Sequence, residues 1–150
     1  MKLKLPSIIF GTIIGLSTGP LLAVPESLTF HGRITVDQVN FTGTGSFRFA
    51  LVNADGNVTY WSNDGTSVNG GIPSQSVSLE VVNGFYRVIL GDGSLANMTA
   101  VPNAVFDADD VYLRVWFDDG QNGVQQLTPD QEFTSVGYAM KAGSVDADAI

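Results

Sequence analysis

The feature of this sequence that most limits its fold is an alternation of apolar and polar residues, with a period of two, between short turns rich in Gly, Asn and Asp. This period is typical of strands that bury one face, whereas amphipathic helices repeat every three to four residues. It runs through the chain after Pro25, and helical spacing is absent until the last few residues. We therefore predict an all-β fold: a single antiparallel β-sandwich, jelly-roll-like, of about seven or eight strands, with a short C-terminal helix or extended tail.

The clearest local signal is Asn83-Gly84 between two runs of β-branched and aromatic residues. Asn-Gly is typical of a type I′ turn, since both central residues need positive φ, and we predict that 77–82 and 85–90 pair as a hairpin. The same patterns predict further strands over 28–36, over 47–52 with 58–61, and over 111–117 returning through 124–127. The polar, glycine-rich loop 63–76 is expected to cross the surface between the two sheets.

Residues 1–23 have the three parts of a secretory signal peptide: Lys2 and Lys4, a short apolar run, and a cleavage site after Ala23. The competing interpretation is a membrane anchor, but the run falls short of the roughly 20 apolar residues that span a bilayer. We expect a secreted protein, extracellular or on a bacterial cell surface, with no membrane insertion after signal cleavage. The predicted organisation is a signal peptide at 1–23, a β-sandwich domain at 24–136, and a tail or the start of a stalk or repeat region at 137–150.

Charge and composition exclude several classes of partner and of catalytic site. Without the signal peptide, five basic residues face 15 acidic ones, a net charge of about −10. Nucleic acid is excluded as a partner, because its phosphates require clustered Lys and Arg, and anionic membrane surfaces are disfavoured. His31 is the only histidine and Cys is absent, which excludes Cys-dependent catalysis and the usual zinc sites. We predict no enzyme, no catalytic residue and no cofactor, although the many carboxylates leave a secreted hydrolase open.

Aromatic residues on the strands are candidates for ligand binding. If Val111, Leu113, Val115 and Phe117 face the core, then Tyr112 and Trp116 face outward on either side of Arg114, a platform on which a sugar ring could stack. Tyr60 and Trp61 form a second candidate pair. The alternative is that a covering layer or a subunit partner buries the same residues without any ligand.

Two further patterns carry competing interpretations. Asp118, Asp119 and Asn122 offer oxygen ligands for calcium at close spacing, but they do not match an EF-hand loop, and solvated acidic turns are the simpler interpretation.

All four arginines beyond the signal peptide lie opposite the apolar parity of their strands: Arg33, Arg48, Arg87 and Arg114. They either pair with the chain's own carboxylates or mark an anion site or subunit contact.

Several motifs together resemble a β-domain at the N-terminus of bacterial secreted proteins that continue into fibre-like, tail-fibre-like or other surface modules. The motifs are Phe30-His31-Gly32-Arg33, Asn83-Gly84-Phe85-Tyr86 with Leu90-Gly91, Val111-Tyr112-Leu113, Leu127-Thr128-Pro129, and Ser135 to Tyr138-Ala139 with Ala142. The resemblance spans nearly all of the chain after the signal peptide and carries no catalytic residue across. Two departures, Asp130 where a basic residue is common and Gly137 where proline is, concern the exit into the stalk.

The resulting hypothesis is a secreted, non-enzymatic structural or adhesion module that makes protein contacts through exposed sheet edges or the tail. In the tail, Tyr138, Ala142, Val145 and Ala149 recur at steps of four, three and four, which suits either an oligomerising helix or a frayed polar end. The first alternative is a carbohydrate-binding module that uses the outward aromatic residues. The second is a secreted hydrolase.

Overall fold

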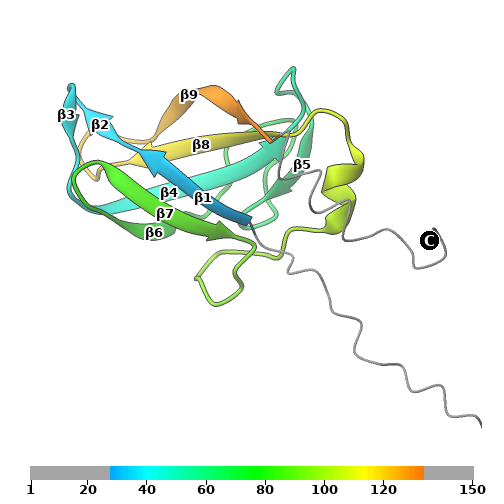
Figure 1. Ribbon diagram of the computed structural model, residues 1–150, viewed down its shortest axis with the longest axis horizontal. Helices are drawn as coiled ribbons and strands as arrows, with labels where there is room; N and C mark the ends of the chain where they lie inside the picture. The colour runs from blue at the N-terminus through cyan, green and yellow to red at the C-terminus, as the bar shows by residue number, and fades with distance from the viewer. Residues whose placement is uncertain (1–27, 134–150) are drawn as a thin grey trace, which may run out of the picture.

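The computed structural model describes residues 28–133, which form nine β-strands and one short 3₁₀ helix (Figure 1). The predicted signal peptide and the tail lie outside the described residues. No helix between residues 28 and 133 is long and apolar enough to cross a membrane. In chain order the elements are β1 Leu28–Arg33, β2 Thr35–Val36, β3 Val39–Asn40, β4 Gly43–Val52, β5 Thr59–Ser62, β6 Val77–Val81, β7 Phe85–Leu90, η1 Asn103–Asp107, β8 Tyr112–Asp118 and β9 Gln125–Glu132.

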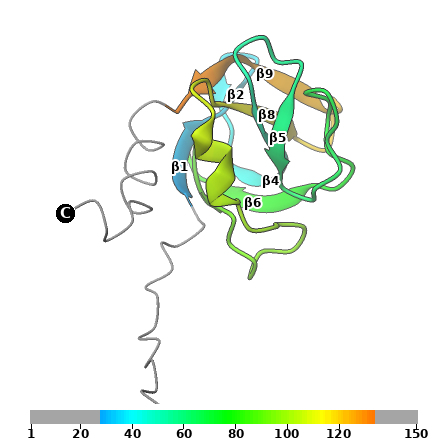
Figure 2. The ribbon, with the colours of Figure 1, turned by 90° about the vertical axis from the view of Figure 1, so that its right-hand side faces the viewer.

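The strands pair in two unequal layers, and every pairing is antiparallel. The larger sheet has five strands in the order β5-β4-β8-β9, with β6 also paired to β4. Within the described part of the chain, the smaller layer consists of β1 and β7, and β2 and β3 form a separate hairpin (Figures 1 and 2). The predicted all-β antiparallel fold is confirmed.

The core lies between the inner face of the five-stranded sheet and the β1–β7 pair. Alternate residues of the central strands β4 and β8 point into it, and the inward parity predicted for 111–117 is confirmed because Leu113, Val115 and Phe117 are buried. From the other layer, Leu28, Val88 and Leu90 are buried against them. Residues of η1 and the segment before it, including Met98 and Phe106, complete the core cluster.

The Asn83-Gly84 turn forms as predicted, but the strands on either side do not pair as a hairpin. Asn83 and Gly84 both have positive φ, 50° and 85°. Only Val82 and Phe85 form a bridge across the turn, after which β6 joins β4 in the larger sheet and β7 joins β1 in the smaller one. The turn is thus a corner between the two layers, since β6 and β7 bury their apolar faces from opposite sides of the core.

The prediction that loop 63–76 crosses between sheets is wrong. β6 pairs with the first half of β4 and β5 with its second half, both on the edge that β8 leaves free. The loop therefore leaves and re-enters the same sheet. It is held there by Asn63, whose side chain is fully buried and donates to the backbone oxygens of Gln75 and Asn97 (2.9 and 3.0 Å).

Candidate functional site

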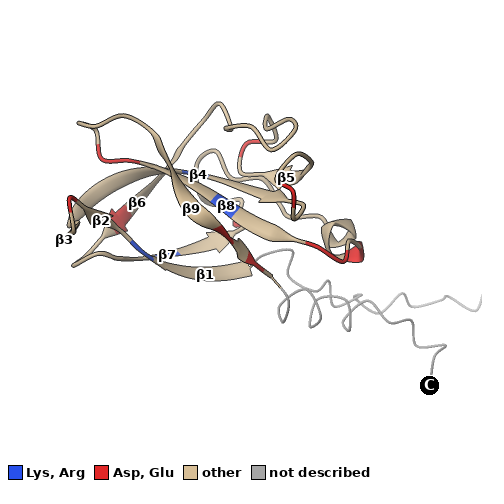
Figure 3. Ribbon diagram, turned by 90° about the horizontal axis from the view of Figure 1, so that it is seen from above, with Lys and Arg blue, Asp and Glu red and all other residues tan. Residues whose placement is uncertain are grey.

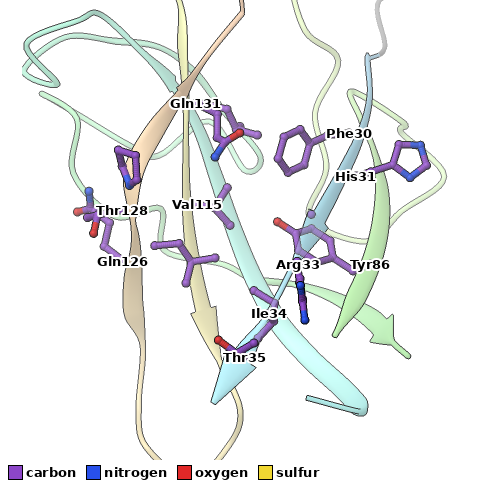
Figure 4. A pocket seen from close by; sticks show the side chains of 14 residues that line it. Phe30, His31, Arg33, Ile34, Thr35, Tyr86, Val115, Gln126, Thr128 and Gln131 are labelled. Carbon is purple, nitrogen blue, oxygen red and sulfur yellow. The ribbon is translucent and has the colours of Figure 1, made fainter. Parts of the chain in front are cut away.

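One side of the sandwich is open between β1 and β9. Each strand has a partner on one edge only within the described part of the chain: β1 pairs with β7, and β9 pairs with β8. Between them lies a groove of about 450 Å³ (Figure 4). We call it the β1–β9 groove; it is lined by Phe30, His31, Gly32, Arg33, Ile34, Thr35, Tyr86, Leu113, Val115, Gln126, Leu127, Thr128, Pro129 and Gln131.

The floor of the groove is apolar and its rim is polar. Leu113, Val115 and Tyr86 form the floor and are almost completely buried. On the rim, exposed Gln131 points inward in Figure 4, whereas His31 points away. Among residues 28–133, no carboxylate lines this groove and no group of three or more potential metal ligands occurs.

Gly32 and Tyr86 pack against each other where the floor of the groove meets β1. They are cross-strand partners, and the Tyr86 ring lies so close over Gly32 that a Cβ there would be 2.3 Å from it. Burial raises the pKa of the Tyr86 phenol well above its ordinary value. The glycine therefore allows a large aromatic ring to cover the backbone of an edge strand.

Main-chain groups of β1 face the groove side. The hydrogen bond from Ile34 N to Gly84 O (2.7 Å) and the register with β7 direct the N–H and C=O groups of even-numbered β1 residues toward β7. The corresponding groups of Thr29, His31 and Arg33 therefore point to the free edge. Such an edge is a template for another strand.

The free edge of β9 is interrupted. Leu113 pairs with Gln131 and Val115 with Leu127, so the three residues Thr128 to Asp130 stand opposite Arg114 alone. A bulge of this kind bends the strand, and Pro129 has no N–H to donate. Of the two edges, β1 is therefore the more regular partner for an added strand.

In the predicted platform, Trp116 is buried and Tyr112 and Arg114 are partly buried, because loops pack over this face. Trp116 is 6% exposed and packs with Ala50 and Val52 in a second cluster, with Tyr112 partly buried against it. The Nη1 of Arg114 donates to the carbonyl oxygens of Gly56 and Gly70 (3.1 and 2.9 Å), so the loops that contain these glycines lie over this face.

The two residues of the second predicted pair differ in burial and in their hydrogen-bond partners. Trp61 is 6% exposed and belongs to the core, where its Nε1 donates to the carbonyl oxygen of Ala100 (3.0 Å). Tyr60 is half-buried and donates its hydroxyl to Asp110 (3.0 Å). Both border a shallow hollow of about 340 Å³. Hydroxyl groups line it, but those of Thr59 and Ser67 already bond each other (3.0 Å).

The three calcium candidates lie at the β8–β9 turn, where the two carboxylates already accept hydrogen bonds from the turn itself. Asp119 accepts the N–H groups of Asn122 and Gln121 (2.7 and 2.8 Å) and the Asn122 side chain (2.6 Å). These bonds lower the pKa of Asp119. Asp118 accepts the N–H of Gly120 (2.7 Å). Both carboxylates thus shape the β8–β9 turn, and in Figure 3 the acidic residues are scattered over the loops, β6 and β9.

The arginines have different surroundings. Arg114 pairs with Asp130, the one ion pair found between residues 28 and 133. Arg33 donates to Asn40 (2.9 Å) and lies over the Phe85 ring. The Nε of Arg48 is buried with no hydrogen-bond partner in this part of the chain. Arg33 and Arg87 belong to the smaller layer and Arg48 and Arg114 to the larger sheet, so the four arginines do not form one shared site.

The β1–β9 groove was not predicted from the sequence. Its strands were recognised, but the groove exists because the smaller layer has two strands and the larger has five, and strand pairing depends on contacts between distant segments. In β1, Phe30 and Ile34 alternate with exposed His31 and Arg33, which indicates that one face of the strand is buried. This alternation does not indicate which edge of the strand is unpaired.

No curated protein and no solved structure matches this chain. A family of domains matches residues 29–130, from β1 into β9, and so covers both walls of the groove. The chain belongs to this family, the domain of unknown function DUF8740.

Proposed function

We propose that this domain is a non-enzymatic structural or adhesion module of a secreted or surface-attached bacterial protein, and that it contacts protein partners through the β1–β9 groove. The observation that carries the proposal is the pairing of two strand edges, β1 and β9, that face one groove without a partner within residues 28–133. Strand addition to such an edge combines main-chain hydrogen bonds with pockets for alternate side chains.

The lining of the groove supports a polypeptide partner over a small polar substrate. Six consecutive residues of β1 and its continuation, 30–35, contribute to one wall, which suits an extended ligand that runs alongside the strand. Hydrolysis of a glycoside needs two carboxylates across a cleft, and this groove has none in its lining. The predicted signal peptide at 1–23 supports a site of action outside the cytoplasm.

The proposal is tested in cells that produce the full chain. We expect the processed protein in the surface or medium fraction, and a photo-crosslinking residue at Gln131 should yield products with a protein on the cell surface. The same residue at Arg87, exposed on β7 away from the groove lining, is the matched control and should yield none. A chain that stays unprocessed in the cytoplasm, or equal products from both positions, would overturn the proposal.

A second candidate is a carbohydrate-binding module at the hollow beside Tyr60. The favouring observation is that this half-buried aromatic ring borders a concave, hydroxyl-rich surface. Tyr60→Ala should then abolish retention on a polysaccharide, whereas Tyr112→Ala, a half-buried tyrosine outside the hollow, should retain it. Absence of retention of the natural chain on a broad glycan panel removes this candidate.

A further inference from the structure

Within residues 28–133, the smaller layer of the sandwich has no strand on the free edge of β1. The two strands β1 and β7 face a sheet of five, and the β1–β9 groove lies over the part of that sheet formed by Leu113, Val115 and Leu127. A third strand next to β1 would pair with its free edge and lie over these side chains. The open groove therefore lies where one added strand would pair with β1.

The geometry points to residues 134–140 of a second copy of this chain as the strand that fills the groove. This inference rests on the proposed function, because it names the partner of the same groove. The association would be an exchange in which the segment that follows β9 in one copy pairs with β1 of the other.

The sequence of this segment suits a strand with one buried face. Val136, Tyr138 and Met140 alternate with Ser135, Gly137 and Ala139. Apolar residues of one parity would contact the floor of the groove, and the small residues of the other would face outward. At about 3.3 Å per residue, six or seven residues match the six residues of β1 in length.

The charge of the segment also suits the groove. It carries no acidic residue and ends next to Lys141, whereas the chain as a whole is strongly acidic. Asp130 and Glu132 belong to β9 but do not line the groove, and Asp130 is paired with Arg114. A neutral strand flanked by one lysine therefore adds no negative charge to the acidic strand β9 when it enters the groove.

The position of Phe133 favours a second copy over the same chain. Its N–H donates to Val111 O (2.8 Å), which continues the β8–β9 ladder one step beyond the pair Tyr112–Glu132. Its ring packs near Phe30, with centroids 6.4 Å apart, at the start of β1. The chain thus runs past the end of the groove. To enter its own groove it would have to reverse within a few residues, whereas the segment of another copy enters without a reversal.

The experiment uses the exported full chain, which has no natural cysteine. One preparation carries Thr35→Cys or Gln131→Cys, at opposite ends of the groove (Figure 4), and a second carries a single cysteine at Val136, Tyr138 or Met140. We expect disulfide-linked dimers between the two preparations on mixing, with the preferred pairs reporting the direction of the added strand. An intramolecular disulfide in chains that carry both cysteines, without mixed dimers, would assign the segment to its own groove and overturn the inference.

Charge substitutions provide an independent measurement. Val136→Asp with Tyr138→Asp should weaken self-association in sedimentation velocity by about ten-fold or more, since it places charge against an apolar floor. The matched control, Ser135→Asp with Ala139→Asp, adds the same charge on the other parity and should leave association near its natural value. If Ala142→Asp with Val145→Asp is the most damaging pair instead, a helical tail drives association and the strand exchange is wrong.

The two proposals fail differently. Crosslinks from Gln131 to a different surface protein, with no mixed disulfide between copies, would overturn the exchange and retain the protein-contact function. Absence of both would overturn the two together.

Discussion

The guanidinium of Arg114 on β8 holds the carboxylate of Asp130 on β9, with Nη2 and Oδ2 2.7 Å apart and Nε 3.1 Å from both carboxylate oxygens. Both side chains are about 15% exposed. The pair spans the β9 bulge, where three residues stand opposite Arg114. Because the remaining Nη1 bonds Gly56 O and Gly70 O, one side chain ties the edge strand to two loops. In the sequence, Asp130 departs from the family pattern, in which a basic residue is common, and this was related to the exit from the domain. In the structure, Asp130 instead pairs with Arg114 within the domain.

Arg114→Ala is expected to lower the free energy of unfolding by about 2–3 kcal/mol, because it removes charge-assisted hydrogen bonds and leaves Asp130 half-buried without a partner. Arg114→Lys should recover only part of this, since an ammonium cannot reproduce the fork of bonds to Asp130 and both glycine oxygens. Urea unfolding measures the effect. Arg87→Ala, at an exposed strand position, is the control and should change stability little; a loss as large as that of Arg114→Ala would contradict the prediction.

Asn63→Ala is expected to cost about 2–4 kcal/mol of stability. The Asn63 side chain is completely buried, accepts the N–H of Phe49 (2.9 Å) and donates to two backbone oxygens in loops. Its removal leaves all three backbone groups without their partner. Hydrogen exchange should show faster opening of loop 63–76, and Asn103→Ala, an exposed asparagine, should show neither effect.

The local patterns of the sequence predicted the local structure. The inward parity of Leu113 and Val115, and the positive φ of Asn83 and Gly84, follow from preferences of neighbouring residues and are confirmed. Which strand pairs with which depends on contacts between distant segments. For this reason the corner at Asn83-Gly84 was taken for a hairpin.

The candidate site depended still more on distant segments. The period of two predicted that Trp116 lies on the face of β8 opposite the core, and it does. That face is covered by loops that contain Gly56 and Gly70, which the period did not predict. Glycine-rich polar loops have no period that reports where they pack. The same limit applies to the β1–β9 groove, whose walls come from opposite ends of the domain sequence.

Gly32→Ala should destabilise the domain by about 1–3 kcal/mol through overpacking. Its Cβ would overlap the Tyr86 ring, so β1 or the ring must shift. Gly93→Ala is the matched control, because a Cβ there meets nothing within 4 Å. A double-mutant cycle with Tyr86→Leu should show less than additive losses. Full additivity would mean that Gly32 is needed for a reason other than contact with this ring.

Acid should destabilise the domain partly through Asp64. Partial burial alone would raise the pKa of this carboxyl, but hydrogen bonds from the N–H groups of Thr66 and Gln75 (3.0 and 2.6 Å) and the Thr66 hydroxyl (2.8 Å) together lower it. A carboxyl whose pKa is depressed by folding contributes stability above its unfolded pKa of about 3.9, and this is lost as the pH falls through the folded pKa.

Asp64→Asn should therefore lower stability at neutral pH and flatten its decline below about pH 4. Urea midpoints measured across the acid range test this. Thr66→Val removes one of the donors and should give an intermediate profile. If Asp64→Asn has the same acid dependence as the natural chain, the hydrogen bonds to Asp64 do not contribute to acid unfolding.

Salt should strengthen the association between copies. Without the predicted signal peptide each chain carries a net charge of about −10, so two copies repel, while the proposed strand segment is free of acidic residues. Screening by salt shortens the range of this repulsion to about 8 Å at physiological ionic strength and about 3 Å at 1 M. The hydrogen bonds and apolar contacts of an added strand depend little on salt.

Asp146→Asn with Asp148→Asn should therefore strengthen association at low salt, and the association of this variant should approach that of the natural chain at high salt. Sedimentation velocity across a salt series measures both. Association that weakens steadily with salt would show instead that ion pairs hold the copies together, which an exchange of residues 134–140 does not provide.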